Sequence, residues 1–368
     1  MQKYVKALLA SFFCLVFIIS LAFATEESEK KALSQGTKVS GQWFISYSNG
    51  KENKIPTNRF VIDRGYIIIE KALSNKISGR ITPDVSVDRE GDGEGDLEMR
   101  LKYCYIDYKF ENTGFLTDPH VEFGLVHRPW ISFEEHINNY RMQGTAYLER
   151  NDIFNSGDFG FTYAALLGGE MSEDYKQQVN SKFPGRYGSV AFGFYNGGGY
   201  HAIEQNNNKT FEARITVRPL PAIIPGFQVS YHSITGKGNT KESPDWNLNT
   251  VFVSYDHRRY GFTGMIHSGI GNFKGKMLDS SGDSLDHSGY SFFGELKFPD
   301  QKVSLIGRYD FFDDNPNSDG NNSKRIITGV AYRIYGKTRA LLDYDINTRD
   351  TWENYTDALT QFTIEYNF

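Results

Sequence analysis

The chain has 368 residues and a formal net charge of −5 at pH 7, and 39% of its residues are hydrophobic. This mildly acidic balance argues against a nucleic-acid partner, because proteins that bind nucleic acids present a basic surface. The 36 glycines, 23 tyrosines and 28 phenylalanines suit a sheet with a thin apolar face better than a helical protein, which would carry more Leu and Ala.

The first predicted element is a signal peptide over residues 1–24. Lys3 and Lys6 precede an apolar run over 7–23, and the run ends in an Ala-Phe-Ala sequence that matches the small-x-small pattern of a signal-peptidase site. We therefore expect an exported mature chain that begins with a short periplasmic extension over 25–36.

Two alternatives to a cleaved signal are weaker. A transmembrane anchor needs roughly 20 apolar residues, whereas this run is shorter and a polar stretch over 26–31 follows it at once. A lipoprotein signal is disfavoured because the bulky Phe13 precedes Cys14. Cleavage also removes Cys14 and leaves Cys104 alone, so the sequence predicts neither a disulfide framework nor a cysteine metal site.

Most of the remaining chain alternates between apolar and polar residues with a period of two, as in the segment 211–218. Successive side chains of a strand point to opposite faces, so such segments are strands with one apolar and one polar face. No later stretch is apolar for roughly 20 residues, so a chain in a membrane would have to cross it as a closed barrel. Segments of about ten residues with a charged inner face and an apolar outer face are typical of such barrels.

The connectors indicate the number of strands. Short turns alternate with long loops rich in Asn, Asp, Gly and Ser, as in barrels whose turns face the periplasm. Both termini are then periplasmic and the strand count is even, so 145–150 belongs to a loop rather than to a seventeenth strand. We predict a 16-stranded antiparallel transmembrane β-barrel over 37–368, with 18 strands as the alternative. The predicted strands are 37–48, 58–72, 76–88, 97–111, 119–128, 158–167, 188–196, 209–218, 226–236, 248–257, 260–269, 288–298, 302–311, 325–334, 337–346 and 359–368.

Three places depart from the regular pattern. The segment 60–71 lacks a clean alternation. In the fourth strand the apolar phase slips between Tyr105 and Ile106, which predicts a β-bulge there. The connector over 169–187 is too long for a periplasmic turn, and we expect it to hold a short helix.

The segment 129–157, after the fifth strand, is the longest predicted outer loop and carries charges of both signs. Folded into the lumen, it would impose a size limit and a transverse field on passing solutes. The alternative is an external loop that only covers the mouth. The charged residues proposed for the constriction are Glu134, Glu135, His136, Arg141, Glu149, Arg150 and Asp152.

Inward-facing basic residues of the strands are the second set of candidates. A sixteen-stranded barrel is wide enough for an aqueous channel, where charged side chains stay hydrated. On the lipid face the same charges would cost roughly 2–4 kcal/mol at mid-membrane. Acids such as Asp84, Glu212 and Asp310 interleave with them, which favours a mixed-charge lumen over an unpaired ladder for anions. The predicted pore-lining residues are Arg80, Arg100, Lys102, Arg214, Arg218, Arg308 and Arg339.

Three further motifs carry less weight. Acids alternate with glycines over 90–96, but the spacing lacks the closing Glu of a calcium loop, so a flexible outer loop is the preferred interpretation. The three glycines over 197–199 lack the strand-to-helix context of a phosphate loop and indicate a hairpin tip. His232 and His267 each precede a serine, yet adjacent strand residues point to opposite faces and cannot share a proton directly.

The last ten residues, Leu359 to Phe368, alternate without a fault. Apolar or aromatic side chains fall on one face, and Gln361, Thr363, Glu365 and Asn367 fall on the other. A terminal strand that ends in an aromatic residue resembles the carboxy-terminal assembly signal of bacterial outer-membrane β-barrels.

Several stretches resemble the phosphate-selective porin O and P family of Gram-negative bacteria. They are Asn58-Arg-Phe-Val-Ile-Asp-Arg-Gly-Tyr-Ile, Ser78-Gly-Arg-Ile-Thr-Pro-Asp-Val, Leu101-Lys-Tyr-Cys-Tyr-Ile-Asp-Tyr, Gly124-Leu-Val-His-Arg-Pro-Trp, Glu134-Glu-His, Ser156-Gly-Asp-Phe-Gly, Phe194-Tyr-Asn-Gly and Arg214-Ile-Thr-Val-Arg-Pro-Leu-Pro. The resemblance spans most of the mature chain and implies a sixteen-stranded, trimeric channel for passive diffusion. In the better-known members of this family, phosphate selectivity goes with a row of lysines along the pore. The inward positions here mix Arg, Asp and Glu instead. The resemblance therefore does not imply phosphate specificity for this chain.

The sequence therefore predicts a porin in the outer membrane of a Gram-negative bacterium. We expect a homotrimer, surrounded by outer-membrane lipid, that lets small hydrophilic solutes or ions diffuse through without a metal or cofactor. The main alternative is a non-channel barrel, such as an adhesin or a conduit that holds a partner protein. An enzyme is less favoured, because the sequence offers no constellation for a nucleophile.

Overall fold

The computed structural model describes residues 36–88, 93–298, 302–318, 321–350 and 355–368, and most of them are in strands. The predicted signal peptide, residues 25–35 of the predicted extension and residues 90–92 of the predicted outer loop over 90–96 lie outside the described residues. The strands are β1 (Lys38–Glu52), β2 (Ile55–Ala72), β3 (Ile77–Val87), β4 (Leu97–Lys109), β5 (Leu116–His127), β6 (Gly157–Leu167), β7 (Gly188–Tyr195), β8 (Thr210–Val217), β9 (Phe227–Lys237), β10 (Asp245–Asp256), β11 (Tyr260–Ile270), β12 (Asp286–Phe298), β13 (Val303–Asp313), β14 (Asn322–Tyr335), β15 (Thr338–Asp350) and β16 (Tyr355–Asn367).

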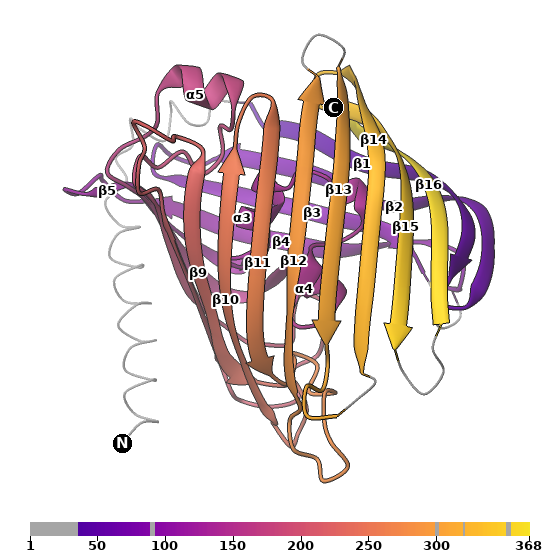
Figure 1. Cartoon of the computed structure of the whole chain (residues 1–368). Coiled ribbons are helices and arrows are strands. Elements are labelled where there is room, and N and C mark those ends of the chain that lie inside the picture. Colours follow the sequence, from indigo (N-terminus) through magenta and orange to yellow (C-terminus); the bar gives the residue numbers. More distant parts are fainter. Residues whose placement is uncertain (1–35, 89–92, 299–301, 319–320, 351–354) are drawn as a thin grey trace.

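These strands form one closed antiparallel barrel (Figure 1). Each strand pairs with its neighbours in the chain, and β16 closes the ring by pairing with β1, from Gln42 opposite Asn367 to Gly50 opposite Leu359. The predicted 16-stranded antiparallel barrel is confirmed, and the alternative with 18 strands is wrong. None of the helices in the described residues is long and apolar enough to cross a membrane.

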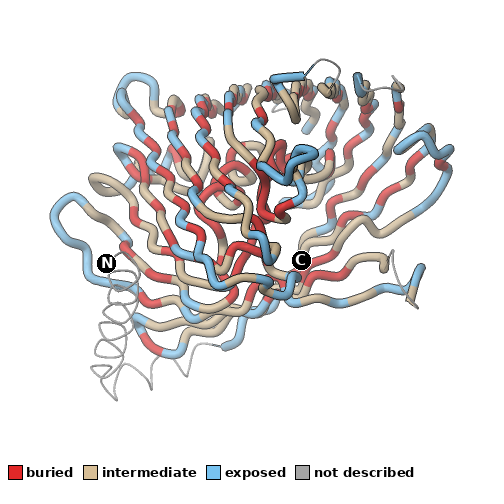
Figure 2. The backbone as a smooth tube through the Cα atoms, turned by 90° about the horizontal axis from the view of Figure 1, so that it is seen from below, coloured by how far each residue is buried: buried red, intermediate tan, exposed pale blue. Residues whose placement is uncertain are grey.

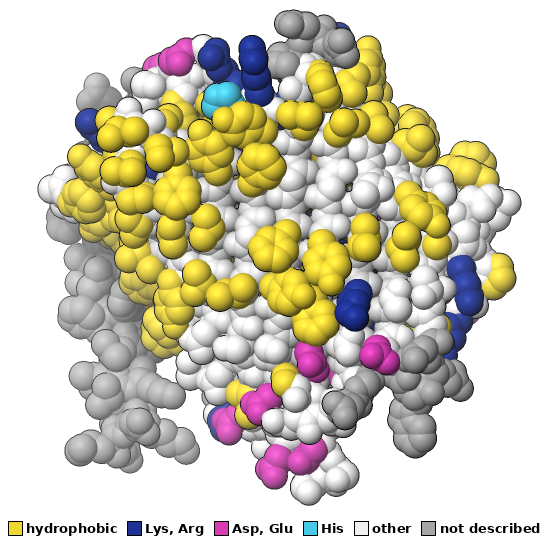
Figure 3. Space-filling model, in the orientation of Figure 1, with side chains coloured by type: hydrophobic (Ala, Val, Ile, Leu, Met, Phe, Trp, Pro, Cys, Tyr) yellow, Lys and Arg dark blue, Asp and Glu magenta, His cyan; other side chains and the backbone are white. Residues whose placement is uncertain are grey.

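The alternation of side chains separates an outer from an inner face. In β16, Phe362 and Tyr366 are 42% and 47% exposed, whereas Glu365 between them is buried. Figure 3 shows the same pattern over β9 to β14, where hydrophobic side chains cover much of the outer surface and acidic side chains gather near the loops. In strands without a register shift, such as β16, the period-two pattern therefore separates the inward side chains from the outward ones.

The two ends of the barrel differ in their connectors. At the turn end, which also holds the carboxy terminus, the connectors are short except for 168–187, which contains α5 (Glu173–Gln178) (Figure 1). Ser172 caps this helix by accepting a hydrogen bond from the backbone N–H of Tyr175. The predicted helix in this connector is confirmed. Most connectors at the opposite end, the loop end, are longer.

The first hairpin extends further than predicted. β1 continues to Glu52 and β2 begins at Ile55, so the predicted loop over 49–57 shrinks to a two-residue turn. Asn53 and Lys54 have positive φ angles of 49° and 68°, as a tight two-residue hairpin turn requires. The polar side chains of 49–57 hid this hairpin from the search for apolar alternation.

A β-bulge explains the irregular sequence over 60–71. The pairing of β1 with β2 shifts between Phe44 opposite Arg64 and Ile45 opposite Ile62, which leaves Asp63 as the extra residue. Beyond this bulge, Tyr66 points inward, as does Arg64, whose guanidinium lies 5.8 Å from the ring of the buried Phe44. The apolar alternation therefore breaks at the bulge.

The predicted bulge between Tyr105 and Ile106 is wrong. β4 pairs with β5 without a shift from Cys104 to Lys109. The irregularity lies closer to the loop end, where Thr82 pairs with Tyr103 but Pro83 pairs with Leu101, so Lys102 is the extra residue. Proline has no backbone N–H to donate to the ladder, which accounts for the break at this position.

Candidate functional site

The connector between β5 and β6, here called the inner segment (residues 128–156), is largely buried. It contains α3 (Ile131–Ile137), a 3₁₀ turn η2 (Arg141–Gln143) and α4 (Tyr147–Arg150), so 145–150 is not a strand, and its last four residues are helical. Its side chains contact inward-facing residues of several strands, and Figure 2 shows buried chain inside the ring of strands. The inner segment therefore determines how much of the lumen is filled.

An apolar cluster fixes one side of the inner segment to the barrel wall. The Trp130 ring stacks on His232, with the centroids 4.9 Å apart, and meets the ring of Phe252 edge-on. The hydroxyl of Tyr147 donates to the carbonyl of Phe311 at 2.6 Å. The buried members are Trp130, Ile131, Phe133, Ile137, Ala146, Tyr147, Leu148, Ile153 and Phe154 of the inner segment with Ile234, Trp246, Leu248, Phe252, Met265, Phe273 and Phe312.

A fully buried ionic network fixes the start of the inner segment. Nε of Arg128 donates to Oε2 of Glu212 at 2.5 Å, and Nε2 of His232 lies 2.9 Å from Oε1 of the same carboxylate. The side chains of all three residues are 0% exposed. The Arg128 guanidinium also lies within about 5.2 Å of the rings of Phe154, Tyr195 and Trp246, which favours a cation in this place.

The middle of the inner segment reaches other strands. The hydroxyl of Tyr140 donates to Glu295 of β12 at 2.5 Å. Arg339 of β15 donates to the carbonyl of Asn139 at 2.5 Å, and the guanidinium of Arg141 lies 5.4 Å from the ring of Tyr66 on β2. Together with the contacts to β8 and β9, these interactions carry the segment from one side of the barrel to the other.

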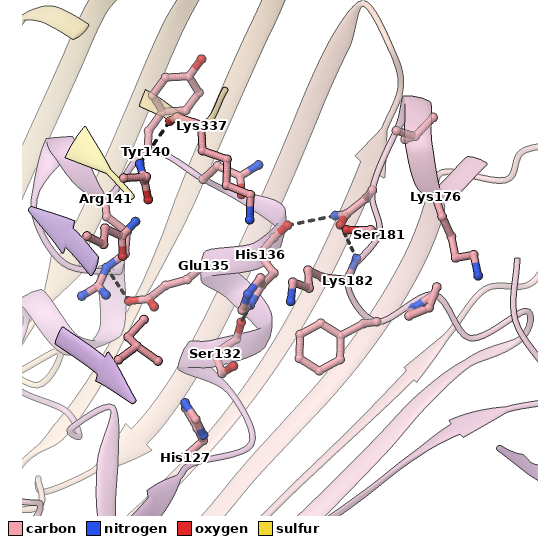
Figure 4. Close-up of a pocket in the computed structure, with 18 of the residues that line it drawn as sticks. His127, Ser132, Glu135, His136, Tyr140, Arg141, Lys176, Ser181, Lys182 and Lys337 are labelled. Atoms are coloured by element: carbon pink, nitrogen blue, oxygen red, sulfur yellow. Dashed lines mark hydrogen bonds and ion pairs between the residues drawn. The ribbon is translucent and has the colours of Figure 1, made fainter. Parts of the chain in front are cut away.

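A cavity of about 2240 Å³ lies at the turn end, between the inner segment, the wall and the connector that holds α5. Its lining includes fifteen Lys or Arg side chains and eight Asp or Glu side chains. Figure 4 shows Lys182 and Lys337 extending into this space near His136, while Glu135 pairs with Arg141 at 2.8 Å. The cavity therefore carries many charged groups, and more of them are basic than acidic.

Seven of the fourteen predicted site residues line this cavity, and they come from both predicted sets. Lys102 donates to the hydroxyl of Tyr66 at 3.2 Å, and Arg80 lies 3.8 Å from Glu70. Arg214 is buried against Phe133, with its guanidinium 4.2 Å from the ring, and donates to the carbonyl of Pro129. The seven residues are Arg80, Lys102, Glu135, His136, Arg141, Arg214 and Arg339.

The other seven predicted residues lie outside the cavity lining. Asp152 pairs with Lys274 at 2.9 Å. Arg150 pairs with Asp310 at 3.0 Å, and Arg308 pairs with the same carboxylate at 2.9 Å. Arg218 is buried and donates to the carbonyls of Gly185 and Pro225, which fastens the connector of α5. Arg100 lies beside Glu98 and Asp84, Glu134 accepts from Trp130, and one carboxylate oxygen of Glu149 is buried without a hydrogen-bond partner.

Sequence reasoning missed several groups that line the cavity. Tyr66 follows the bulge in β2, so its inward orientation was not visible in the pattern. Tyr103 faces inward because of the irregularity at Lys102. Lys182 and Lys337 come from turn-end connectors, for which alternation makes no prediction; the unusual length of 169–187 was the available signal for Lys182.

Burial alters the titration of one carboxyl in α3, which is not part of the barrel wall. Burial raises the pKa of Glu134 from its usual range to about 7, while Arg308 and the hydrogen bond from Trp130 act in the opposite direction. The folded protein thus favours the neutral form of Glu134. This contribution to stability is complete below about pH 4 and is lost as the pH rises through 7.

We expect Glu134→Gln to weaken the pH dependence of unfolding. The amide keeps an acceptor for Trp130 but cannot ionise, so the wild type should lose on the order of 3 kcal/mol more than the variant between pH 4 and pH 8. Urea unfolding at both pH values, followed by circular dichroism, measures this difference. Glu173→Gln, at an exposed carboxylate of α5, is the control; an identical pH dependence in Glu134→Gln and wild type would contradict the assignment.

Metal ligands are not grouped in this site. No cluster of three or more His, Cys, Asp or Glu side chains suited to a metal ion occurs in the part of the chain that the structure describes. His267 and His287 lie close together, with ring centroids 5.3 Å apart, but both pack against Phe312.

The barrel is similar to solved outer-membrane proteins. It matches the anion-selective porin from Comamonas acidovorans with a TM-score of 0.61 at 10% identity, covering 90% of this chain and 99% of that one. It matches OmpF of Salmonella typhi, solved with daunomycin, with 0.59 at 13% identity (90% and 97% covered), and the trimer form of OmpT, an outer membrane protein of Vibrio cholerae, with 0.56 at 12% (90% and 99%). No protein-family model matches the sequence, and no curated protein matches it. At these identities the likeness establishes the fold.

Proposed function

We propose that this chain is an outer-membrane porin, a passive diffusion channel for small hydrophilic solutes or ions. The observation that carries the proposal is the cavity of about 2240 Å³, lined by many charged groups, inside a closed barrel whose outer face is apolar. An apolar outer face suits contact with lipid hydrocarbon, and a charged lumen suits water and hydrated solutes. The predicted signal peptide over 1–24 would export the chain to that membrane.

The inner segment supports a constriction of mixed charge. Glu135 and Arg141 lie on its surface toward the cavity, and Lys102 and Tyr66 lie on the facing wall. Charged groups at a narrow place select solutes by size and by the sign of their charge. The proposal extends to a general or weakly selective channel and not to phosphate, because acids such as Glu135 lie among the basic groups.

We further propose a homotrimer, since one similar barrel, OmpT of Vibrio cholerae, is described in a trimer form. The proposal includes no catalysis. His232 and His267 are buried inside the barrel, whereas the serine after His267 is exposed on the outer face, so the two side chains are separated by the wall.

Planar-bilayer recording of the purified mature protein tests the channel. We expect stepwise conductance increases, in groups of three if the protein inserts as a trimer. A non-channel barrel is the second candidate, and the apolar cluster that fills part of the lumen favours it. That candidate predicts insertion into the bilayer without conductance, and such a result would remove the porin proposal.

The surplus of basic groups in the cavity predicts a preference for anions at low salt. The ammonium groups of Lys182 and Lys337 make no ion pair among the described residues, so changing both to Glu should lower the anion-to-cation permeability ratio severalfold at 0.1 M salt. The effect should shrink at 1 M salt, where the screening length falls from about 10 Å to about 3 Å. Reversal potentials in a salt gradient give this ratio.

The control for this charge change is Lys209→Glu with Lys241→Glu. It adds the same charge to connectors at the loop end, away from the cavity lining. Equal ratios in both double variants would show that Lys182 and Lys337 do not set the preference.

A further inference from the structure

The connector between β7 and β8, residues 196–209, reaches a strand that is not its neighbour. The hydroxyl of Tyr200 donates to Oδ2 of Asp84 on β3 at 3.2 Å. β4, β5 and β6 separate β3 from β7 in the ring. Tyr200 therefore extends across part of the lumen instead of lying over its own hairpin.

The base of this connector is held in place by several contacts. The backbone N–H of Gly197 donates to Oδ2 of Asp158 at 2.9 Å. Gly197 and Gly199 have φ angles of 112° and 86°, which residues other than glycine rarely adopt. Asn239 binds the connector further along, by accepting from the N–H of Gln205 at 2.9 Å.

The ring of Tyr200 contacts the ammonium group of Lys102, one of the residues proposed to line the constriction. The Lys102 ammonium lies 5.7 Å from the Tyr200 ring, 5.7 Å from the Tyr103 ring and 4.8 Å from the Tyr66 ring. Lys102 is only 4% exposed, and its one described hydrogen bond is to the hydroxyl of Tyr66. Three tyrosines from β2, β4 and the β7–β8 connector thus surround one ammonium group.

On β3 and β4 the lining of the cavity ends at Thr82 and Lys102, toward the loop end. Tyr66, Lys102 and Tyr103 line the cavity, whereas Tyr200 touches Lys102 but is not part of the lining. A solute that moves from the turn end past Lys102 toward the loop end meets the ring of Tyr200. Asp84, the partner that holds this ring, has a second carboxylate oxygen that is buried without a hydrogen-bond partner.

We propose that Tyr200 is a specificity-determining residue of the channel, whose ring narrows the passage at Lys102 from the side of the loop end. The inference rests on the proposed diffusion channel and names the residue that limits solute size in it. A hydrogen bond to Asp84 and a cation–π contact with Lys102 hold the ring, and a passing solute with hydroxyl or charged groups offers Asp84 and Lys102 replacement contacts. Apolar solutes of the same size offer no replacement and are disfavoured.

Single-channel recording of the full mature protein tests the role of Tyr200. Tyr200→Ala removes the ring, so conductance should rise by about twofold, because pore diameter sets the barrier to small ions. Tyr200→Phe keeps the ring but loses the bond to Asp84, so the open level should stay unchanged while transitions between levels become more frequent. Ile203→Ala, in the same connector and 82% exposed, is the matched control and should behave as wild type.

Swelling of liposomes that contain each variant gives a second measurement, with arabinose and the trisaccharide raffinose as probes. We expect Tyr200→Ala to raise the rate for raffinose relative to arabinose, and Ile203→Ala to leave the ratio unchanged. Far-UV circular dichroism confirms that each variant keeps its strands.

The outcomes separate the two proposals. Conductance in the wild type with an unchanged level and solute ratio in Tyr200→Ala overturns the role of Tyr200 and leaves the channel standing. A silent wild type with a conducting Tyr200→Ala overturns both the open channel and the role of Tyr200 in specificity, because Tyr200 would then close the lumen instead of selecting solutes. Silence in both, with protein inserted and folded, overturns the channel and this inference together.

Discussion

Replacing Glu212 by alanine is expected to lower the free energy of unfolding by about 3–5 kcal/mol, because it leaves the buried Arg128 without its partner. Both side chains are completely buried, and water cannot reach the guanidinium to compensate. The start of the inner segment would lose its attachment to β8, so the current through the open channel should also fluctuate more. Urea unfolding of the protein in lipid vesicles, followed by circular dichroism, measures the first effect, and bilayer recording measures the second.

The control for this experiment is Glu70→Ala. Glu70 also faces the lumen and pairs with Arg80 and Lys38, but its side chain is 39% exposed, so water screens the pair. Such a change should cost about 0–1 kcal/mol. An equal decrease in the free energy of unfolding for Glu212→Ala and Glu70→Ala would show that burial does not strengthen the ion pair between Arg128 and Glu212.

Truncating Trp130 to alanine should be similarly costly, by about 3–5 kcal/mol, because it leaves a cavity in the apolar cluster. Trp130 is 0% exposed and contacts His232, Phe252 and Phe133, and its indole N–H donates to Glu134 at 2.8 Å. The helix α3 would then be held less firmly against the wall. We expect faster cleavage of the inner segment by a soluble protease, in addition to the loss measured by unfolding.

Ile223→Ala is the reference for the tryptophan change. Ile223 lies in the turn-end connector between β8 and β9 and is 76% exposed, so its truncation should stay within about 0.5 kcal/mol of wild type. If Trp130→Ala were as stable as Ile223→Ala and equally resistant to protease, the cluster would not be what holds the inner segment.

The barrel could be predicted from the sequence because one physical pattern repeats in it. A strand between lipid and water must alternate, and segments such as 211–217 and 359–368 do so clearly. The pattern fails where an extra residue changes the phase, as at Asp63 and Lys102, or where both faces are polar, as over 49–57. These failures shift positions locally and leave the strand count unchanged.

The candidate site was less predictable, since its contacts join distant parts of the chain. The inner face of β10 is apolar at Leu248 and Phe252, and its outer face carries Val251 and Val253. A strand that is apolar on both faces shows no alternation, so the apolar cluster inside the lumen left no periodic signal. The sequence predicted that charged residues line the inner wall. It could not show which of them line the cavity and which bind buried partners, because that depends on where the inner segment lies.

The pairing of β1 with β16 has a consequence for the order of folding. Gln42 donates to Glu365 across a separation of 323 residues, so this contact forms only after the last strand has been synthesised. Closing so long a loop is entropically costly, and chains dominated by distant pairings fold slowly. Until the first and last strands meet, two strand edges remain open to pairing with other chains. The barrel is therefore prone to aggregate before β1 and β16 pair. A chain that lacks its final strand could never close the barrel and would stay prone to aggregate.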